Sequence, residues 1–189
     1  MVSALGGRVP KIASTAWVHP AATIVGDVEI GAGASIWPGA VLRGDFGSIR
    51  IGAGTSIQDN AVLHAAPNGP TTVGRDCVIA HLAFIEAATV GDGCMVAVGA
   101  LVLPGAVLHD GSVAAAGAAL AKGIEVPTGH RAQGVPAQIV AIGHPDRDYI
   151  ATGARRYAQM AQHYAEAGVG DTGLDLEPRF RLPTKADKC

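Results

Sequence analysis

The sequence predicts an all-β fold, a parallel β-helix, followed by one C-terminal α-helix. Three observations predict it: an aliphatic residue returns every six positions, aromatic residues are scarce, and the pattern becomes helical after about residue 146. Of 189 residues, 49% are hydrophobic but only 4% are aromatic, with 26 Gly and 11 Pro. Such a composition suits a core of many thin, similar layers rather than an ordinary sandwich.

The six-residue period is the main evidence for the coil. It is neither the period of a helix nor the alternation of a strand. Each unit supplies a short strand with one inward aliphatic side chain and a turn of small residues, and three units close one coil of about 18 residues. Successive coils then pair as parallel strands. The aliphatic positions are Val18, Ile24, Ile30, Ile36, Leu42; Ile51, Ile57, Leu63; Val73, Ile79, Ile85; and Val90, Val96, Val102, Leu108, Ala114, Leu120.

Three segments follow from this pattern. Residues 1–145 are predicted to form the β-helix domain, interrupted by a loop at 65–72 whose Pro-Asn-Gly-Pro sequence favours turns. Residues 146–168 are predicted to form an α-helix that packs along the coil and stops at Gly168. The tail, 169–189, has no periodicity, and we expect it to be extended or disordered.

Composition also excludes several classes of function. The net charge is −2 and no basic run occurs, which argues against nucleic acid or an anionic membrane as a partner. No apolar stretch approaches the roughly 18 residues of a membrane span, and the first residues lack a secretion-signal pattern. The three Cys have unrelated spacings and no CxxC motif, as expected for reduced thiols. We therefore expect a cytoplasmic protein.

Stacking of the coils gathers polar residues into two ladders. Arg43, His64 and Glu86 each follow an inward aliphatic residue on one face, so they should stack about 4.8 Å apart. Asp59 and His81 each lie two residues after an inward aliphatic residue on the preceding face, and they form the second ladder. Ionisable side chains are therefore concentrated on two neighbouring faces over three coils.

The two ladders predict a site shared between copies. Side chains on different faces of one prism do not easily meet, so we expect His64 and Glu86 from one chain to meet His81 of its neighbour. Two His and one carboxylate form a known Zn²⁺ set with a position open for water, and a known Fe²⁺ set as well. The alternative is that these side chains only line a solvated groove, because an H-x₄-E pair alone is a weak signal.

Three motifs resemble those of the gamma-class carbonic anhydrases and their homologues. They are Arg43-Gly44-Asp45, the stretch IQDNAVLH at 57–64, and Ile79-Ala80-His81. The resemblance covers roughly residues 8–165 and includes the closing GVPA at 134–137. It implies a left-handed β-helix of hexapeptide repeats and a homotrimer with a metal at each subunit interface.

The resemblance also implies roles for four residues around the metal. Arg43 and Asp45 would contribute ion pairs between subunits and the architecture of the site. Gln58 and Asp59 would orient the metal-bound water and pair with the arginine. The stacking of Asp59 beneath His81 agrees with this, because a carboxylate beside a ligating His is a common way to fix such a site.

The chain departs from the family at the third metal ligand. His64 and His81 fall on two family ligands, but the family's His-x₄-His-Gly is here His81-x₄-Glu86-Ala87. Either Glu86 ligates or tight metal binding has been lost. A Glu ligand would reduce the Lewis acidity of the metal, so that its water is a poorer acid. We expect Zn²⁺, with Fe²⁺ or Co²⁺ as alternatives, or no metal if Glu86 does not ligate.

The leading functional hypothesis is a metal-dependent hydratase or lyase like a carbonic anhydrase. Its small-molecule substrate would be CO₂, or another small molecule that is hydrated or hydrolysed. One alternative is a hexapeptide-repeat acyltransferase, which leaves the RGD and QD residues unexplained. Another is a non-catalytic, metal-free binding or scaffold trimer, for which Glu86 is the best indication. For Tyr157 and Tyr164 of the predicted helix, we favour a packing role over a role in the site.

Overall fold

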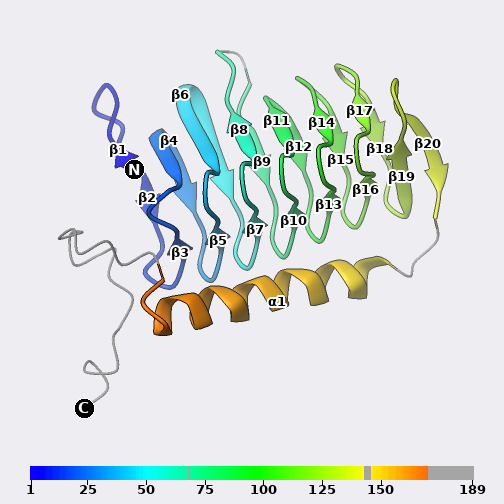
Figure 1. Ribbon diagram of the computed structural model, residues 1–189. Coiled ribbons are helices and arrows are strands. Elements are labelled where there is room, and N and C mark those ends of the chain that lie inside the picture. The colour runs from blue at the N-terminus through cyan, green and yellow to red at the C-terminus, as the bar shows by residue number, and fades with distance from the viewer. Residues whose placement is uncertain (68, 143–145, 170–189) are drawn as a thin grey trace.

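The computed structural model describes residues 1–67, 69–142 and 146–169. The chain winds as a parallel β-solenoid, and one long helix, α1 (Asp146–Glu166), runs along its outside (Figure 1). The strands stack as the three faces of a prism, so that each strand pairs with its equivalent in the next coil. The predicted fold class, a parallel β-helix followed by an α-helix, is confirmed.

The first face, called here the helix-covered face, lies under α1. Its strands pair in parallel down the whole coil, except that the last one turns back antiparallel. They are β3 (Trp17–Val18), β5 (Ser35–Ile36), β7 (Ser56–Ile57), β10 (Val78–Ile79), β13 (Met95–Val96), β16 (Val113–Ala114), β19 (His130–Gln133) and β20 (Gln138–Ala141).

The other two faces share two long strands, β4 (Thr23–Ile30) and β6 (Val41–Ile51), which continue around a corner. The site face holds the first halves of β4 and β6 together with β1 (Val2–Ser3), β8 (Val62–His64), β11 (Phe84–Glu86), β14 (Leu101–Val102) and β17 (Ala119–Leu120). The third face holds their second halves together with β2 (Lys11–Ile12), β9 (Thr71–Val73), β12 (Thr89–Val90), β15 (Val107–Leu108) and β18 (Glu125–Val126).

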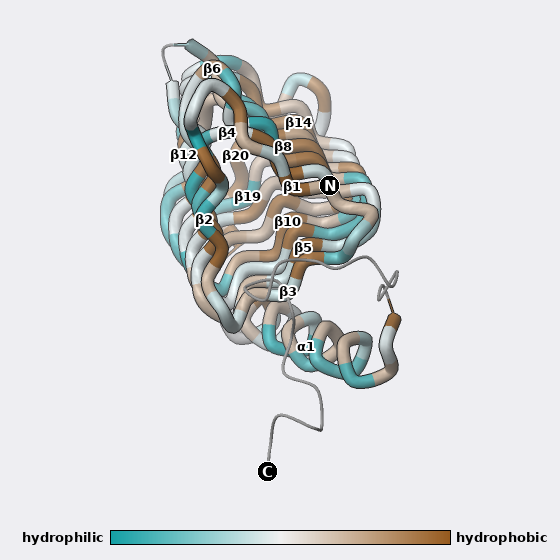
Figure 2. Tube along the Cα trace, turned by 90° about the vertical axis from the view of Figure 1, so that its left-hand side faces the viewer, coloured by the Kyte–Doolittle hydropathy of each residue, from teal (hydrophilic) through white to brown (hydrophobic). Residues whose placement is uncertain are grey.

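The inward aliphatic side chains form one continuous core. Leu42, Leu63 and Ile85 are stacked in register on the site face and are fully buried. Ile57 and Ile79 are stacked in the same way on the helix-covered face. Figure 2, which looks roughly along the coil axis, shows the coils superposed with α1 outside one face. The six-residue period therefore gives the correct register for the residues of both ladders.

The repeat continues on both sides of the positions recognised in the sequence, Val18 to Leu120. At its start, Ile12 already pairs with Ile30, six residues before the first predicted repeat position. At its end, Val126 and Ala132 continue the period beyond Leu120, and both are fully buried. Short side chains such as Ala132 carry little hydrophobic signal, so these last layers are hard to recognise in the sequence.

The corner between Leu42 and Ile51 is enlarged. Leu42 pairs with Ile24, and Ile51 pairs with Ile30. The two paired positions are therefore nine residues apart along β6 but only six apart along β4. The extra residues lie between Gly44, which pairs with Gly26, and Ile49, which pairs with Val28. This insertion places Asp45 and Phe46 beside the polar ladder rather than within the regular strand.

Helix α1 packs one apolar stripe against the coil. Ile150, Ala154 and Ala161 are buried, and the aromatic rings of Tyr157 and Tyr164 meet Trp37 edge to face. Within the described part of the chain, no helix is long and apolar enough to span a membrane. The predicted extended or disordered tail, 169–189, lies outside the described residues except for its first residue.

Candidate functional site

The first ladder lies on the site face where the period predicts it. Strand register pairs Arg43 with His64 and His64 with Glu86. The His64 side chain is the most enclosed of the three, with 12% of its surface exposed, against 29% for Glu86 and 45% for Arg43. An imidazole so enclosed, with polar groups on both sides, has its orientation fixed by its neighbours.

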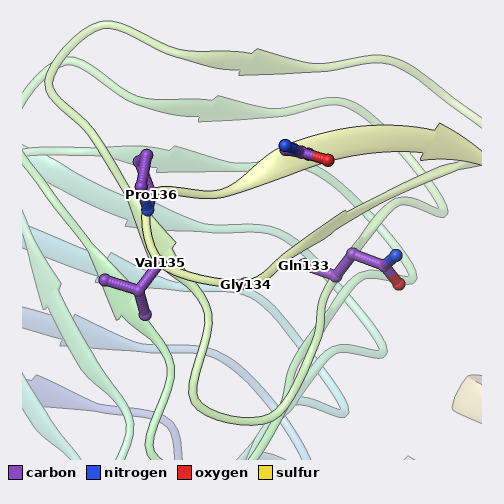
Figure 3. Close-up of a pocket in the computed structure, with 5 residues that line it drawn as sticks. Gln133, Gly134, Val135 and Pro136 are labelled. Atoms are coloured by element: carbon purple, nitrogen blue, oxygen red, sulfur yellow. The ribbon is translucent and has the colours of Figure 1, made fainter.

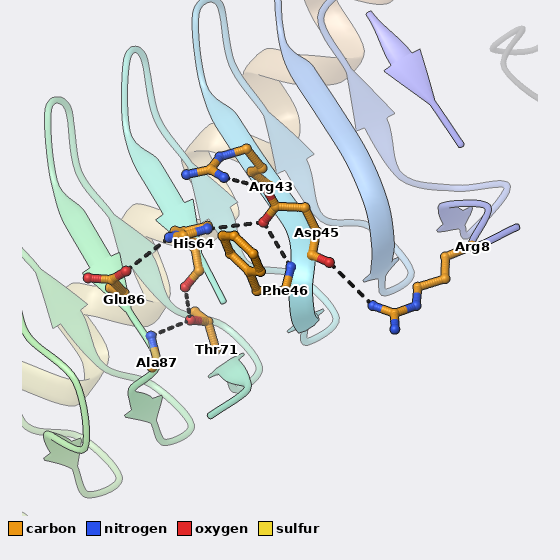
Figure 4. Close-up of polar contacts among 8 residues, drawn as sticks. All are labelled: Arg8, Arg43, Asp45, Phe46, His64, Thr71, Glu86 and Ala87. Carbon is orange, nitrogen blue, oxygen red and sulfur yellow. Dashed lines mark hydrogen bonds and ion pairs between the residues drawn. The ribbon is translucent and has the colours of Figure 1, made fainter. Parts of the chain in front are cut away.

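His64 has a carboxylate at each ring nitrogen (Figure 4). Its Nδ1 lies 2.9 Å from Oε1 of Glu86, and its Nε2 lies 3.0 Å from Oδ1 of Asp45. The backbone of His64 is held too, because the buried hydroxyl of Thr71 donates to its carbonyl oxygen and accepts from the amide of Ala87 at 2.8 Å. The ring is thus clamped between two strands of the same face.

Asp45 anchors the enlarged corner to this site. Its carboxylate accepts hydrogen bonds from the Arg43 guanidinium and, at 2.9 Å, from the amide of Phe46. Burial acts to raise the pKa of Asp45, but the hydrogen bonds from Arg43, His64 and the Phe46 amide outweigh it and leave this pKa below its ordinary value. Asp45 is therefore an anion at neutral pH and a firm acceptor for the His64 ring.

The second ladder is completed by the C-terminal helix. His81 Nδ1 lies 3.0 Å from Oδ2 of Asp59, as the stacking of their coils predicts. Its Nε2 lies 3.4 Å from the hydroxyl of Tyr157 on α1. Burial, followed by the charge of Asp59, raises the pKa of Tyr157, which therefore stays protonated and can donate to His81. Tyr157 therefore packs against Trp37 with its ring and contacts His81, a candidate metal ligand, with its hydroxyl.

The two ladders stay apart within one chain. Over residues 1–67, 69–142 and 146–169, no three His, Cys, Asp or Glu side chains converge as metal ligands. His64 contacts Glu86 and Asp45, whereas His81 contacts Asp59 and Tyr157. One chain thus offers His64 and Glu86 as a pair of donors, and His81 faces a different direction.

The structure buries Gln58 and two of the cysteines. Gln58 is almost completely buried, with 3% of its surface exposed, at the corner just before Asp59, and the described residues include no hydrogen bond from its side chain to His64 or His81. Cys77 and Cys94 are fully buried inside the coil. A thiolate ligand at the surface of the site face is therefore not available from either cysteine.

Two site residues were missed by sequence reasoning. Phe46 lies edge to face on the His64 ring, with 5.9 Å between ring centres, while 59% of its own surface is exposed. Thr71 lies at the far end of the 65–72 loop, so its hydrogen bond to His64 cannot be recognised in the sequence. The only sequence signal for Phe46 was its place directly after the RGD motif.

A separate shallow pocket lies at the turn between β19 and β20 (Figure 3). It is lined by Gln133, Gly134, Val135, Pro136 and Gln138, at the C-terminal end of the coil. None of these side chains is titratable or a good metal ligand. Unlike the two ladders, this pocket therefore offers no group for acid–base or metal chemistry.

The donor geometry suits a divalent metal. Two ligands at usual Zn–N and Zn–O distances from one metal are about 2.9–3.4 Å apart for bond angles of about 90–109°. The 2.9 Å between His64 Nδ1 and Glu86 Oε1 lies at the edge of this range. Each ring nitrogen of His64 lies at hydrogen-bond distance from a carboxylate, so a metal between Nδ1 and Glu86 would take the place of the hydrogen there, while Nε2 keeps its hydrogen bond to Asp45. In the same way, a hydrogen on His81 Nδ1 donated to Asp59 leaves its Nε2 as an acceptor, which a metal would take over from the Tyr157 hydroxyl.

Comparison with known proteins agrees with this architecture. A family model for the bacterial transferase hexapeptide (six repeats) matches residues 10–44, in keeping with the left-handed coil that such repeats imply. The chain is 36% identical over 182 residues to gamma carbonic anhydrase 2, mitochondrial, of Arabidopsis thaliana, covering 92% of this chain and 66% of that protein. It therefore spans just under two thirds of that relative's length.

Two further relatives match over nearly their whole length. The carnitine operon protein CaiE of Proteus sp. is 30% identical, and the match covers 97% of this chain and 96% of CaiE. The crystal structure of a hexapeptide transferase family protein from Anaplasma phagocytophilum has a TM-score of 0.83 and 37% identity, covering 87% of this chain and 98% of that one. The chain therefore belongs to the family of hexapeptide-repeat proteins that includes these two relatives.

Proposed function

We propose that this chain forms a homotrimer with one divalent metal at each interface and acts as a carbonic anhydrase-like hydratase. His64 and Glu86 of one copy and His81 of the next would hold the metal. The substrate would be CO₂ or another small molecule that undergoes hydration or hydrolysis. The similarity to gamma carbonic anhydrase 2 supports the reaction class, and the geometry of His64 carries the proposal.

His64 is arranged as a metal ligand is in proteins. A ligating His normally donates its second ring N–H to a carboxylate, which fixes both tautomer and orientation. Asp45 is that carboxylate for His64, and Arg43 holds Asp45 in place. Because Glu86 Oε1 already lies 2.9 Å from His64 Nδ1, the two groups would need little movement to bind one metal in place of the hydrogen between them.

His81 is arranged in the same way, but its side chain is more exposed than that of His64. Asp59 accepts from its Nδ1, and 42% of the His81 side chain is exposed. Within the described residues, its Nε2 has one partner, the Tyr157 hydroxyl at the long distance of 3.4 Å. An exposed, oriented imidazole suits a ligand that is supplied to a neighbouring copy.

The site face has the character of an interface. Down its outside, Val41, Val62, Phe84 and Leu101 stack in register as one apolar stripe beside the ladder, and Leu101 is 41% exposed. The equivalent column on the third face begins with Lys11, Glu29, Arg50, Thr72 and Thr89 and is mostly polar. Since α1 covers the remaining face, the apolar stripe is the surface best suited to pack against a second copy.

Different residues from each copy would complete each site. Such a head-to-tail interface closes into a ring, whereas a two-fold interface would use the same patch on both sides. The trimeric ring is the assembly that the family resemblance implies. Each copy then contributes His64 and Glu86 to one site and His81 to another.

The protein's own groups would orient the reactants. When bound, Zn²⁺, or Fe²⁺ or Co²⁺ in its place, would acidify water and polarise the electrophilic carbon. Asp59 and Gln58 would orient that water, and the Arg43–Asp45 pair would fix the His64 ring. The 65–72 loop carries no acidic side chain, so the proton must leave through solvent buffer or another group.

Complementation between two inactive variants tests the shared site. His64→Ala and His81→Ala should each lose metal when purified alone. When the two are unfolded, mixed and refolded together, mixed trimers regain interfaces with both histidines, and metal content and hydration activity should return in part. Recovery no greater than that of each variant refolded alone would contradict a site shared between copies.

An acyltransferase is the second candidate. His81 and Asp59, 3.0 Å apart, also form the pair that a general base needs, and one relative is a hexapeptide transferase family protein. This reading predicts that coenzyme A raises the melting temperature of the protein. No shift at millimolar coenzyme A, in a protein that binds metal, favours the hydratase.

A further inference from the structure

Two exposed apolar side chains flank the candidate ligands. Phe46 lies against the His64 ring with 59% of its surface exposed, held there by the hydrogen bond from its amide to Asp45. Leu82 directly follows His81 and is 60% exposed. Exposed apolar side chains are common on protein surfaces, but these two lie directly beside the candidate ligands.

Leu82 also has an unfavourable backbone conformation. Its φ of 61° lies in the left-handed region. The equivalent turn positions in other coils are Gly39, Gly99 and Gly117, with φ of 65° to 70°, and Asn60. An added Cβ at Gly99 or Gly117 would meet nothing within 4 Å, so space alone does not select the residue there. Leucine is strained at this turn where glycine is not, and such outliers gather at functional sites.

We propose that Phe46 of one copy and Leu82 of its neighbour form the apolar wall of the shared site and restrict it to small substrates. This rests on the proposed function, because the two side chains approach each other only if His64 and His81 bind one metal. Leu82 is bonded to His81 and Phe46 touches His64, so joining the two histidines brings both apolar groups to the rim of the same site.

The charges around the site nearly cancel. Asp45, Asp59 and Glu86 bring three carboxylates, against the guanidinium of Arg43, which is paired with Asp45, and that of Arg8, which donates to the Asp45 carbonyl oxygen at 3.4 Å. Together with a divalent metal they leave no strong field of either sign. The selection therefore rests on the apolar wall, which favours a small substrate over a bulky one such as a coenzyme A thioester.

The size selection can be measured without turnover. Cobalt-loaded protein is titrated with imidazole and with 4-phenylimidazole, two neutral metal ligands of different size, and the visible absorption of the cobalt reports binding. We expect the larger ligand to bind the natural protein about tenfold more weakly, an effect of the size that pocket contacts usually produce. Leu82→Gly and Phe46→Ala should each bring the two dissociation constants within about threefold.

Val98→Ala is the matched control. Val98 is 47% exposed and stacks on His81 one coil further along, so it shares the corner but not the proposed wall. Its ratio of dissociation constants should equal that of the natural protein. An unchanged ratio in Leu82→Gly, with trimer mass and cobalt content intact, would overturn the proposal, as would loss of the trimer in that variant. Absence of trimer or cobalt in the natural protein would instead refute the proposed function itself.

Discussion

Replacing Asp45 tests how the site face orients His64 for metal binding. Asp45 accepts hydrogen bonds from Arg43, from the Phe46 amide at 2.9 Å and from His64 Nε2 at 3.0 Å. In Asp45→Asn the amide oxygen can still accept from His64, but without the charge, and charge-assisted hydrogen bonds are roughly twice as strong as neutral ones. We expect metal affinity to fall about tenfold, the lower end of the usual effect of such partners, or about 1.4 kcal/mol. Asp45→Ala, which frees the ring, should approach a hundredfold loss, or about 2.7 kcal/mol.

Isothermal titration of the metal-free trimer with Zn²⁺ measures both losses. Asp27→Asn is the matched control, because Asp27 forms a similar ion pair with Arg50 at 2.8 Å, across β4 and β6 on the other side of the corner. It should leave zinc affinity unchanged. If Asp45→Ala bound zinc within threefold of the natural protein, Asp45 would not orient a ligand and the account of His64 would be wrong.

Four further outcomes follow from the structure. Leu63→Ala should lower the free energy of unfolding by about 2–5 kcal/mol in urea denaturation, because Leu63 is fully buried between two coils; a loss below about 1 kcal/mol would contradict tight packing there. Since the pKa of Asp45 is depressed, its stabilisation is complete above the unfolded value of about 3.9 and is lost as pH falls through the lower folded value; unfolding of Asp45→Asn should therefore depend less on pH in this acidic range. Glu86→His should tighten zinc binding, and an unchanged affinity would favour the metal-free scaffold. Trp37→Ala should loosen α1, seen as faster amide exchange of the helix while the coil stays protected.

The sequence was sufficient for much of the fold because its period maps directly onto space. Once residues recur every six positions, strand register follows, and with it the stacking of Arg43, His64 and Glu86 and of Asp59 and His81. Each coil repeats the same geometry, so no long-range information is needed. This is why polar residues far apart in the chain could be grouped before the structure was known.

The remaining features depend on contacts that break the period. Phe46 belongs to the inserted corner of β6, whose course no repeat predicts, and Tyr157 reaches His81 only because α1 docks along the coil. Which ring nitrogen of His64 contacts Asp45 and which contacts Glu86 also depends on the tertiary structure. The period sets which residues stack, but not which ring nitrogen each neighbour takes.

Metal content per trimer tests the central claim most directly. The untagged protein would be analysed by light scattering for its mass and by inductively coupled plasma mass spectrometry for bound metal, before and after incubation with Zn²⁺, Fe²⁺ or Co²⁺. A trimer with about one metal per chain is the predicted result, because each interface forms one two-His, one-carboxylate site. A trimer that takes up none of the three metals would contradict the account, and Glu86 would then serve to close a metal-free scaffold.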